Sequence, residues 1–140
     1  MIKNVMTNSV WLYQVGFGRC NKCSLEICNM FSARYCNQTR GLRPVSWPSH
    51  ADVLMVSGTS NSCDGKALTR IFDTIASPKA VIGVGSCALN KGVFQDDFLE
   101  LTTLDKLLPV DVFIPGCPPR PEGIIAGIKK MLNMYRPESR

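Results

Sequence analysis

The stretch KAVIGVGSC, from Lys79 to Cys87, determines how this chain can fold. Its centre is a short, continuous run of apolar residues, which is typical of a strand buried on both faces of a parallel sheet. Gly85, Ser86 and Cys87 follow at once, so a thiol comes directly after the expected strand at 79–84. In a parallel sheet this position lies at the carboxyl edge, where open α/β folds bind their ligands.

Further segments on both sides of this stretch extend the pattern. Strands are expected from β-favouring runs at 10–15, 52–56 and 110–114. Helices are expected at 24–35, 64–76 and 122–135. The polar segment 37–50 is expected to be a loop, and 89–103 matches no pattern. Because strands alternate with helices, the sequence predicts a mainly parallel sheet between two layers of helices. We expect one small three-layer α/β domain that spans residues 1–140.

Composition limits the classes of function. Hydrophobic residues make up 45% of the 140 residues and charged residues 19%, which is typical of a globular protein. The net charge is +5, but Lys and Arg are scattered, so no nucleic-acid partner is expected. No run reaches the roughly 18 apolar residues of a membrane span, and the N-terminus has no apolar signal segment. We expect a cytoplasmic protein, or one attached to a membrane only through partners.

The chain contains seven cysteines, an odd number that argues against a complete disulfide framework. Without an export signal the thiols should stay reduced, so metal binding becomes the leading explanation. Cys20 and Cys23 follow the first expected strand, Cys87 follows the third, and Cys117 follows the fourth, in PGCPP. Parallel strands all point the same way, so these four thiols are expected to meet at one edge of the sheet.

Four converging thiolates suit either an iron–sulfur cluster or zinc. One Cys-x-x-Cys pair with two distant single cysteines beside glycine or proline favours a cluster, because zinc sites usually combine two short pairs. A zinc knot of Cys20, Cys23, Cys28 and Cys36 is the rival interpretation. Otherwise Cys28 and Cys36 are expected to be small core residues. Cys63 follows the second expected strand and is either an inert residue at a helix start, which is the favoured interpretation, a thiol near the cluster, or a substitute ligand. Glu26 lies one helical turn after Cys23 and is a candidate proton-path residue.

Three motifs together carry a family resemblance: CNKCSLE at 20–26, GSC at 85–87 and PGCPP at 115–119. They resemble the cluster-bearing small subunit that [NiFe] hydrogenases share with respiratory complex I. The two residues between the paired cysteines are similar to hydrogenases, since complex I subunits typically have adjacent cysteines there. The short chain after the closing helix resembles the energy-converting, membrane-bound hydrogenases.

The resemblance implies a flavodoxin-like fold and one [4Fe–4S] cluster, ligated by Cys20, Cys23, Cys87 and Cys117. It implies a subunit of a ferredoxin-linked oxidoreductase, with no substrate site of its own. The implied partners are a Ni–Fe large subunit, a ferredoxin-like subunit and the membrane subunits of an ion-pumping arm. The implied location is the cytoplasmic face of the cell membrane, where partners hold the subunit peripherally.

Two other functions are considered. One is the equivalent subunit of a quinone- or sulfur-reducing complex without Ni–Fe chemistry, because Lys22 stands where such hydrogenases usually have Gly. The other is a zinc-stabilised interaction module. If a cluster is present, a cation at Lys22 should stabilise its reduced state and raise its potential.

Overall fold

The computed structural model describes residues 9–18, 20–77, 79–92 and 101–135. Its strands are β1 (Val10–Phe17), β2 (Leu42–Pro44), β3 (Val53–Gly58), β4 (Ala80–Val84) and β5 (Val112–Ile114). Its α-helices are α2 (Lys22–Asn29), α3 (Ser62–Thr74), α4 (Ser86–Asn90) and α5 (Pro121–Tyr135). Short 3₁₀ helices are η1 (Ala33–Tyr35), η2 (Pro48–His50) and η4 (Leu104–Lys106).

The five strands form one sheet in the order β2-β1-β3-β4-β5, and every neighbouring pair is parallel. This is the flavodoxin-like order. The predicted parallel sheet and fold class are therefore confirmed. In such folds the order of strands reverses between the first strand and its inner neighbour, here β1 and β3. The crevice at the carboxyl ends of those two strands is the usual place for a ligand.

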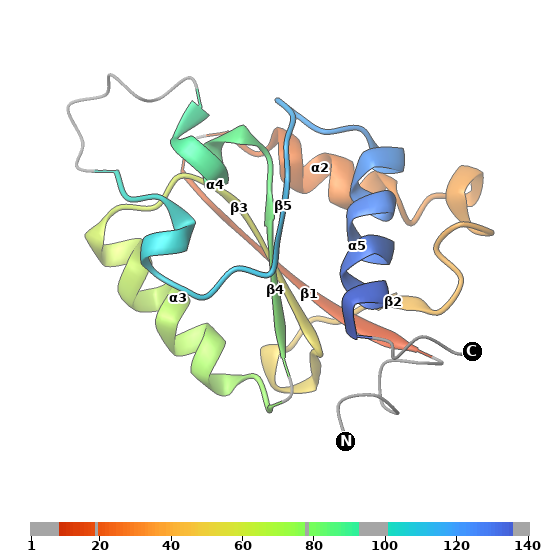
Figure 1. The fold of residues 1–140 in the computed structure, drawn as a ribbon, viewed down its shortest axis with the longest axis horizontal. Coiled ribbons are helices and arrows are strands. Elements are labelled where there is room, and N and C mark those ends of the chain that lie inside the picture. Colours follow the sequence, from red (N-terminus) through yellow and green to blue (C-terminus); the bar gives the residue numbers. More distant parts are fainter. Residues whose placement is uncertain (1–8, 19, 78, 93–100, 136–140) are drawn as a thin grey trace.

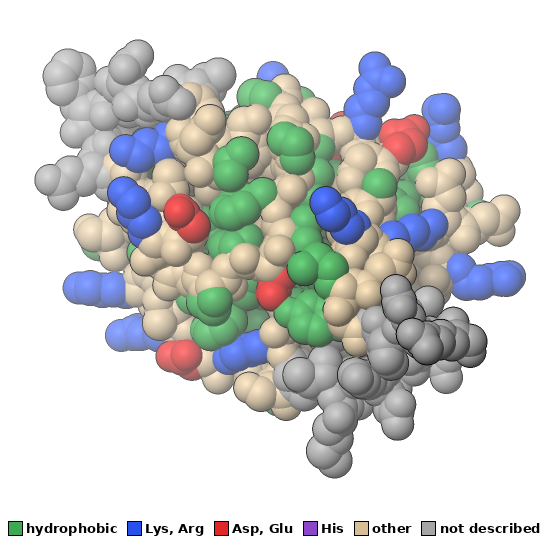
Figure 2. Space-filling model, in the orientation of Figure 1, with side chains coloured by type: hydrophobic (Ala, Val, Ile, Leu, Met, Phe, Trp, Pro, Cys, Tyr) green, Lys and Arg blue, Asp and Glu red, His purple; other side chains and the backbone are tan. Residues whose placement is uncertain are grey.

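The sheet is covered by helices on both faces (Figure 1). Along β3, Val53 and Met55 pack with α2 and α5 on one face, while Leu54 and Val56 pack with α3 on the other. This alternation follows from the two-residue period of a strand. Every residue of β4 is buried, as the continuous apolar run at its centre predicts. Figure 2 shows hydrophobic side chains gathered down the middle of the face that carries β5.

The first helix is shorter than predicted. The sequence predicts a helix over 24–35, but α2 runs from Lys22 to Asn29 and is followed by η1. The amides of Phe31 and Ser32 donate to carbonyls three residues back, which tightens the last turn and ends the helix. By contrast, α3 begins earlier than expected, at Ser62, because Asn61 and Asp64 form a capping box.

The expected loop at 37–50 contains a short strand, β2, and the 3₁₀ helix η2. β2 pairs with β1 at the edge of the sheet, and none of its three residues is fully buried. An exposed edge strand that contains Pro44 has no apolar alternation and no continuous apolar run, so its sequence resembles a loop. The unassigned segment 89–103 includes the end of α4, while residues 93–100 lie outside the described residues.

Candidate functional site

The loops at the carboxyl edge of the sheet carry the predicted ligands. Because all strands are parallel, β1, β3, β4 and β5 end on the same side of the molecule, at the top of Figure 1. Cys20 lies between β1 and α2, and Cys23 lies in the first turn of α2. Cys87 is the second residue of α4, and Cys117 lies between β5 and α5.

These four cysteines line one pocket, which is partly open to solvent. Cys87 is the deepest, with 8% of its surface exposed, whereas Cys20 and Cys117 are exposed. The structure therefore brings the four predicted ligands to one place, and their role as ligands stays a prediction. The pocket lining is Phe17, Cys20, Lys22, Cys23, Gly58, Thr59, Cys87, Gly116, Cys117 and Pro118.

Backbone hydrogen bonds fix the Cys87 loop against the Cys117 loop. The amide of Gly85 donates to the carbonyl of Ile114 at 2.8 Å, which continues the ladder between β4 and β5. The amide of Ser86 then donates to the carbonyl of Gly116 at 2.9 Å. The Ser86 hydroxyl donates to that same carbonyl oxygen at 3.2 Å. Two thiols that are thirty residues apart in the sequence are thus held by adjacent, mutually bonded loops.

Gly85 allows the Cys87 loop to approach Cys23. Its φ is +90°, a region that residues with a side chain rarely adopt. A Cβ atom at this position would lie 2.6 Å from the Cys23 Sγ, closer than two non-bonded atoms can sit. A residue with a side chain would therefore displace either this loop or the Cys23 thiol.

The surroundings of the Cys23 thiol disfavour its negatively charged form. Burial raises its pKa to about 11, with further contributions from the charges of Cys87, Cys20 and Cys117. Four thiolates would repel one another in this space unless cations compensate for their charge. Iron and zinc both do so, and both bind thiolate in preference to thiol. The donor set therefore fits an iron–sulfur cluster. Within the described residues, no three His, Cys, Asp or Glu side chains form a site for a single metal ion.

The remaining cysteines lie elsewhere. Cys28 is exposed, and its thiol donates to the Gln14 Oε1 at 3.8 Å, which directs it to β1 and away from the pocket. Cys36 is also exposed, at the end of η1. The expectation that these two are core residues is therefore wrong. Cys28 takes an exposed position within α2, whereas Cys36 follows η1, beyond the end of that helix. Cys63 is an exposed residue in the first turn of α3.

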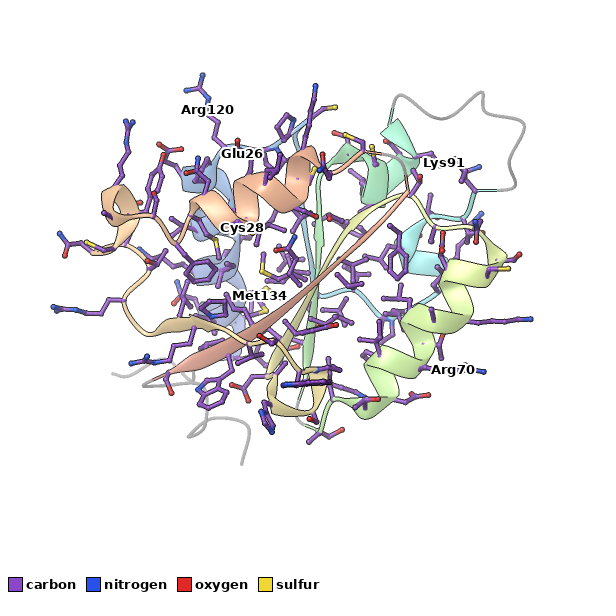
Figure 3. All side chains as sticks on the ribbon, turned by 180° about the vertical axis from the view of Figure 1, so that it is seen from behind. Glu26, Cys28, Arg70, Lys91, Arg120 and Met134 are labelled. Atoms are coloured by element: carbon purple, nitrogen blue, oxygen red, sulfur yellow. The ribbon has the colours of Figure 1, made fainter. Side chains whose placement is uncertain are left out.

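Glu26 is half-buried on α2 and does not contribute to the pocket lining described above. In Figure 3 it lies toward the upper rim of α2, on the side of Arg120. Its charge acts on Tyr35, whose hydroxyl donates to Glu122 at 2.9 Å. That hydrogen bond is the main reason why the pKa of Tyr35 is raised. A role for Glu26 in a proton path stays a prediction.

Sequence reasoning missed Thr59 and the part played by Gly58 at this site. Both follow β3, and both line the pocket with the cysteines. The signal was available, because Ser57 and Gly58 end an expected strand, and the residue after a parallel strand lies at the carboxyl edge. A threonine at that edge carries no chemical signature as distinct as a thiol, so this loop did not stand out.

Comparison with known proteins identifies relatives over most of the chain. A family model described as "NADH ubiquinone oxidoreductase, 20 Kd subunit" matches residues 17–131. A probable membrane-bound hydrogenase subunit, mbhJ, of Pyrococcus furiosus is 36% identical over 93% of this chain and 80% of its own length. One of the subunits of the F(420)H(2) dehydrogenase of Methanosarcina mazei is 37% identical over 89% of this chain and 66% of its own length. The expected family, and the expectation of an oxidoreductase subunit, are therefore confirmed.

A solved structure is similar as well. A chain in the structure of the membrane-bound sulfane sulfur reductase, described as an archaeal respiratory membrane complex, superposes with a TM-score of 0.79. It is 31% identical, and the match covers 94% of this chain and 73% of that chain. Although relatives are named as membrane-bound, no helix in the described part of this chain is long and apolar enough to cross a membrane.

Proposed function

Because this chain belongs to the family of the 20 Kd subunit of NADH ubiquinone oxidoreductase, we propose that it is an electron-transfer subunit that holds one [4Fe–4S] cluster. The complex would be a complex I-like, energy-converting [NiFe] hydrogenase. In it, this subunit would connect a ferredoxin-like subunit to the Ni–Fe large subunit. Membrane subunits of an ion-pumping arm would hold it peripherally at the cytoplasmic face of the membrane.

The observation that carries this proposal is the shared pocket of Cys20, Cys23, Cys87 and Cys117. Four thiols from the three segments that follow β1, β4 and β5 meet where flavodoxin-like folds place a ligand. When bound, a cluster of this kind takes up and releases one electron at a time. The pocket has no polar side chain other than the thiols, Lys22 and Thr59, so the residues serve to hold a cofactor and exclude water rather than to bind a polar substrate.

Individual residues have separate tasks in this proposal. Cys87 is almost fully buried and would fix the inner side of the cluster, while the exposed Cys20 and Cys117 face outward, toward a partner subunit. Lys22 contributes a positive charge at the rim, which offsets the negative charge of four thiolates. Glu26 is the candidate for proton transfer, through its half-buried position one turn along α2.

Metal analysis tests the proposal. The complex is purified without oxygen, with this subunit in place, and iron, acid-labile sulfide and zinc are measured. We expect four irons and four sulfides at this subunit and an EPR signal after reduction. One zinc, without iron or a visible absorption band, would instead support a zinc-stabilised interaction module and overturn the proposal.

A second candidate is the equivalent subunit of a quinone- or sulfur-reducing complex. The likeness to the sulfane sulfur reductase structure favours it. The large subunit encoded beside this chain decides between the two. Two Cys-x-x-Cys pairs in that subunit are expected for a Ni–Fe centre, and their absence would select the second candidate.

A further inference from the structure

Thr59 is a largely buried polar residue of the pocket whose hydroxyl has no hydrogen-bond partner among the described residues. It lines the pocket together with the four cysteines, although only 6% of its surface is exposed. Among the residues that the structure describes, no group hydrogen-bonds its hydroxyl, in contrast to the neighbouring Ser57 and Ser60, which have partners at 3.2 and 3.3 Å. Thr59 is thus a largely buried residue whose hydroxyl has no partner among the described residues and can still form a hydrogen bond.

The Thr59 hydroxyl borders open space rather than packed protein. In the described part of the chain, every side-chain oxygen or nitrogen that is fully enclosed has a hydrogen-bond partner. The unpartnered Thr59 Oγ1 is therefore not fully enclosed, and Thr59 is one of the residues that line the pocket. A hydroxyl in this position is able to donate to whatever the four thiols hold.

The backbone around Thr59 is held firmly in place. Gly58 has a φ of +86°, and a Cβ atom there would lie 1.8 Å from the carbonyl oxygen of Phe17. On the other side, Ser60 accepts a backbone hydrogen bond from Thr102 at 2.8 Å. Asn61 then caps α3. These constraints hold the backbone on both sides of Thr59 in place before any ligand binds, as a supporting residue in a cofactor site requires.

We propose that the Thr59 hydroxyl donates a hydrogen bond to a sulfur atom of the group held by Cys20, Cys23, Cys87 and Cys117, and thereby favours its reduced form. The inference rests on the proposed iron–sulfur function. Reduction adds negative charge to the sulfurs, and a hydrogen bond to the more negative state is the stronger one. Thr59 therefore raises the reduction potential of the group without ligating it.

Redox titration of the purified complex tests this inference. Thr59→Val has nearly the same volume but no hydroxyl, Thr59→Ser keeps the hydroxyl, and Ser60→Ala removes a neighbouring hydroxyl that bonds to Thr102 instead. We expect Thr59→Val to lower the EPR midpoint potential by up to about 59 mV, a tenfold shift in the ratio of reduced to oxidised cluster for one electron. Thr59→Ser and Ser60→Ala should stay close to the wild type.

Pulsed EPR gives a second readout that a purely structural role would not change. In the reduced wild-type complex, the exchangeable hydroxyl proton of Thr59 should give a strong coupling to the cluster, and this coupling should disappear after transfer to D₂O. Thr59→Val should lack the coupling in both solvents. If Thr59→Val fails to load iron, Thr59→Ala compared with Thr59→Ser makes the same comparison.

Full iron content with an unchanged potential and an unchanged proton coupling in Thr59→Val would overturn the inference and leave the proposed function intact. Wild-type complex without iron at this subunit would instead overturn the proposed function itself.

Discussion

At the amino edge of the sheet, Asp52 and Asp111 each stand one residue before a strand, whereas glycines, cysteines and Thr59 follow the strands at the carboxyl edge. The Asp52 carboxylate accepts a hydrogen bond from the amide of Trp11 at 3.0 Å. The Asp111 carboxylate accepts one from the amide of Val81 at 2.8 Å, and a second from the hydroxyl of Tyr135. The same carboxylate thus joins β4, β5 and the end of α5.

The two edges therefore satisfy their polar groups differently. At the amino edge, carboxylates of the chain itself complete the hydrogen bonds that the strand ends would otherwise lack. At the carboxyl edge, four cysteines and Thr59 line a pocket. Stability and chemistry are therefore assigned to opposite ends of the same strands, so changes at the two ends should have different consequences.

The largest effect is expected for Cys87→Ala, at the carboxyl edge. Removal of the most buried thiol should eliminate the EPR signal of this subunit and most of its iron, because three thiolates cannot complete a four-thiolate site. The matched control is Cys63→Ala, which removes an exposed thiol from the start of α3. Equal iron contents in the two variants would contradict the ligand assignment.

Gly85→Ala should also act on the cofactor rather than on the core. The added Cβ would lie 2.6 Å from the Cys23 Sγ, and the φ of +90° would cost about 1–3 kcal/mol for a residue with a side chain. We expect reduced iron loading, measured per purified complex. Gly123→Ala is the control, since a Cβ there meets no atom within 4 Å. Normal loading of Gly85→Ala would show that the close approach is dispensable.

Asp111→Ala tests the amino edge. It leaves the amide of Val81 and the hydroxyl of Tyr135 without their acceptor, at a cost of about 1–3 kcal/mol in the free energy of unfolding. Denaturant unfolding followed by circular dichroism measures this loss, with Asp73→Ala on the exposed side of α3 as the control. If Asp111→Ala also shifted the midpoint potential of the cluster, the two edges would not have the separate roles described here.

Lys22→Gly should lower the midpoint potential of the cluster by a small amount, because Lys22 lines the pocket but is itself exposed to solvent. Water and salt screen an exposed charge, so the difference from the wild type should shrink as ionic strength increases. Lys22→Arg keeps the charge and should behave as the wild type. EPR titration at two salt concentrations checks all three proteins.

The smallest effect concerns pH at the amino edge. The pKa of Tyr135 is raised from 10.0 to about 12, chiefly by its hydrogen bond to Asp111 and to a smaller extent by burial. A raised pKa in the folded state gives stability that is complete below pH 10.0 and is lost as pH rises to about 12. Since Tyr135 is partly exposed, we expect a loss below about 1 kcal/mol. Tyr135→Phe should show a flatter stability profile across this interval in thermal unfolding scans.

Much of the fold could be predicted because its strands are buried on both faces. A buried parallel strand must be apolar throughout, so β3 and β4 were evident in the sequence, and their loops could be placed at one edge. The edge strand β2 could not be predicted in this way, because its residues are not fully buried and impose no pattern. The end of α2 was missed because local i to i+3 hydrogen bonds, rather than a helix-breaking residue, terminate it.

The candidate site was predicted only in part. The four cysteines could be found because each follows a strand or lies near one, and parallel strands bring such residues together. Thr59 could not be singled out, because a threonine after a strand is common and carries no chemical signal by itself. Its significance comes from its burial beside the thiols and its missing hydrogen-bond partner.

The family, the parallel sheet and the edge at which the thiols gather could all be inferred from the sequence, because they follow from apolar runs and from the residues that occur directly after them. Which residues line the space between the loops, and how each loop is held, became evident only from the three-dimensional structure. That depends on contacts between residues far apart in the chain, such as Gly85 with Cys23 and Phe17 with Gly58, whose distances no local pattern encodes.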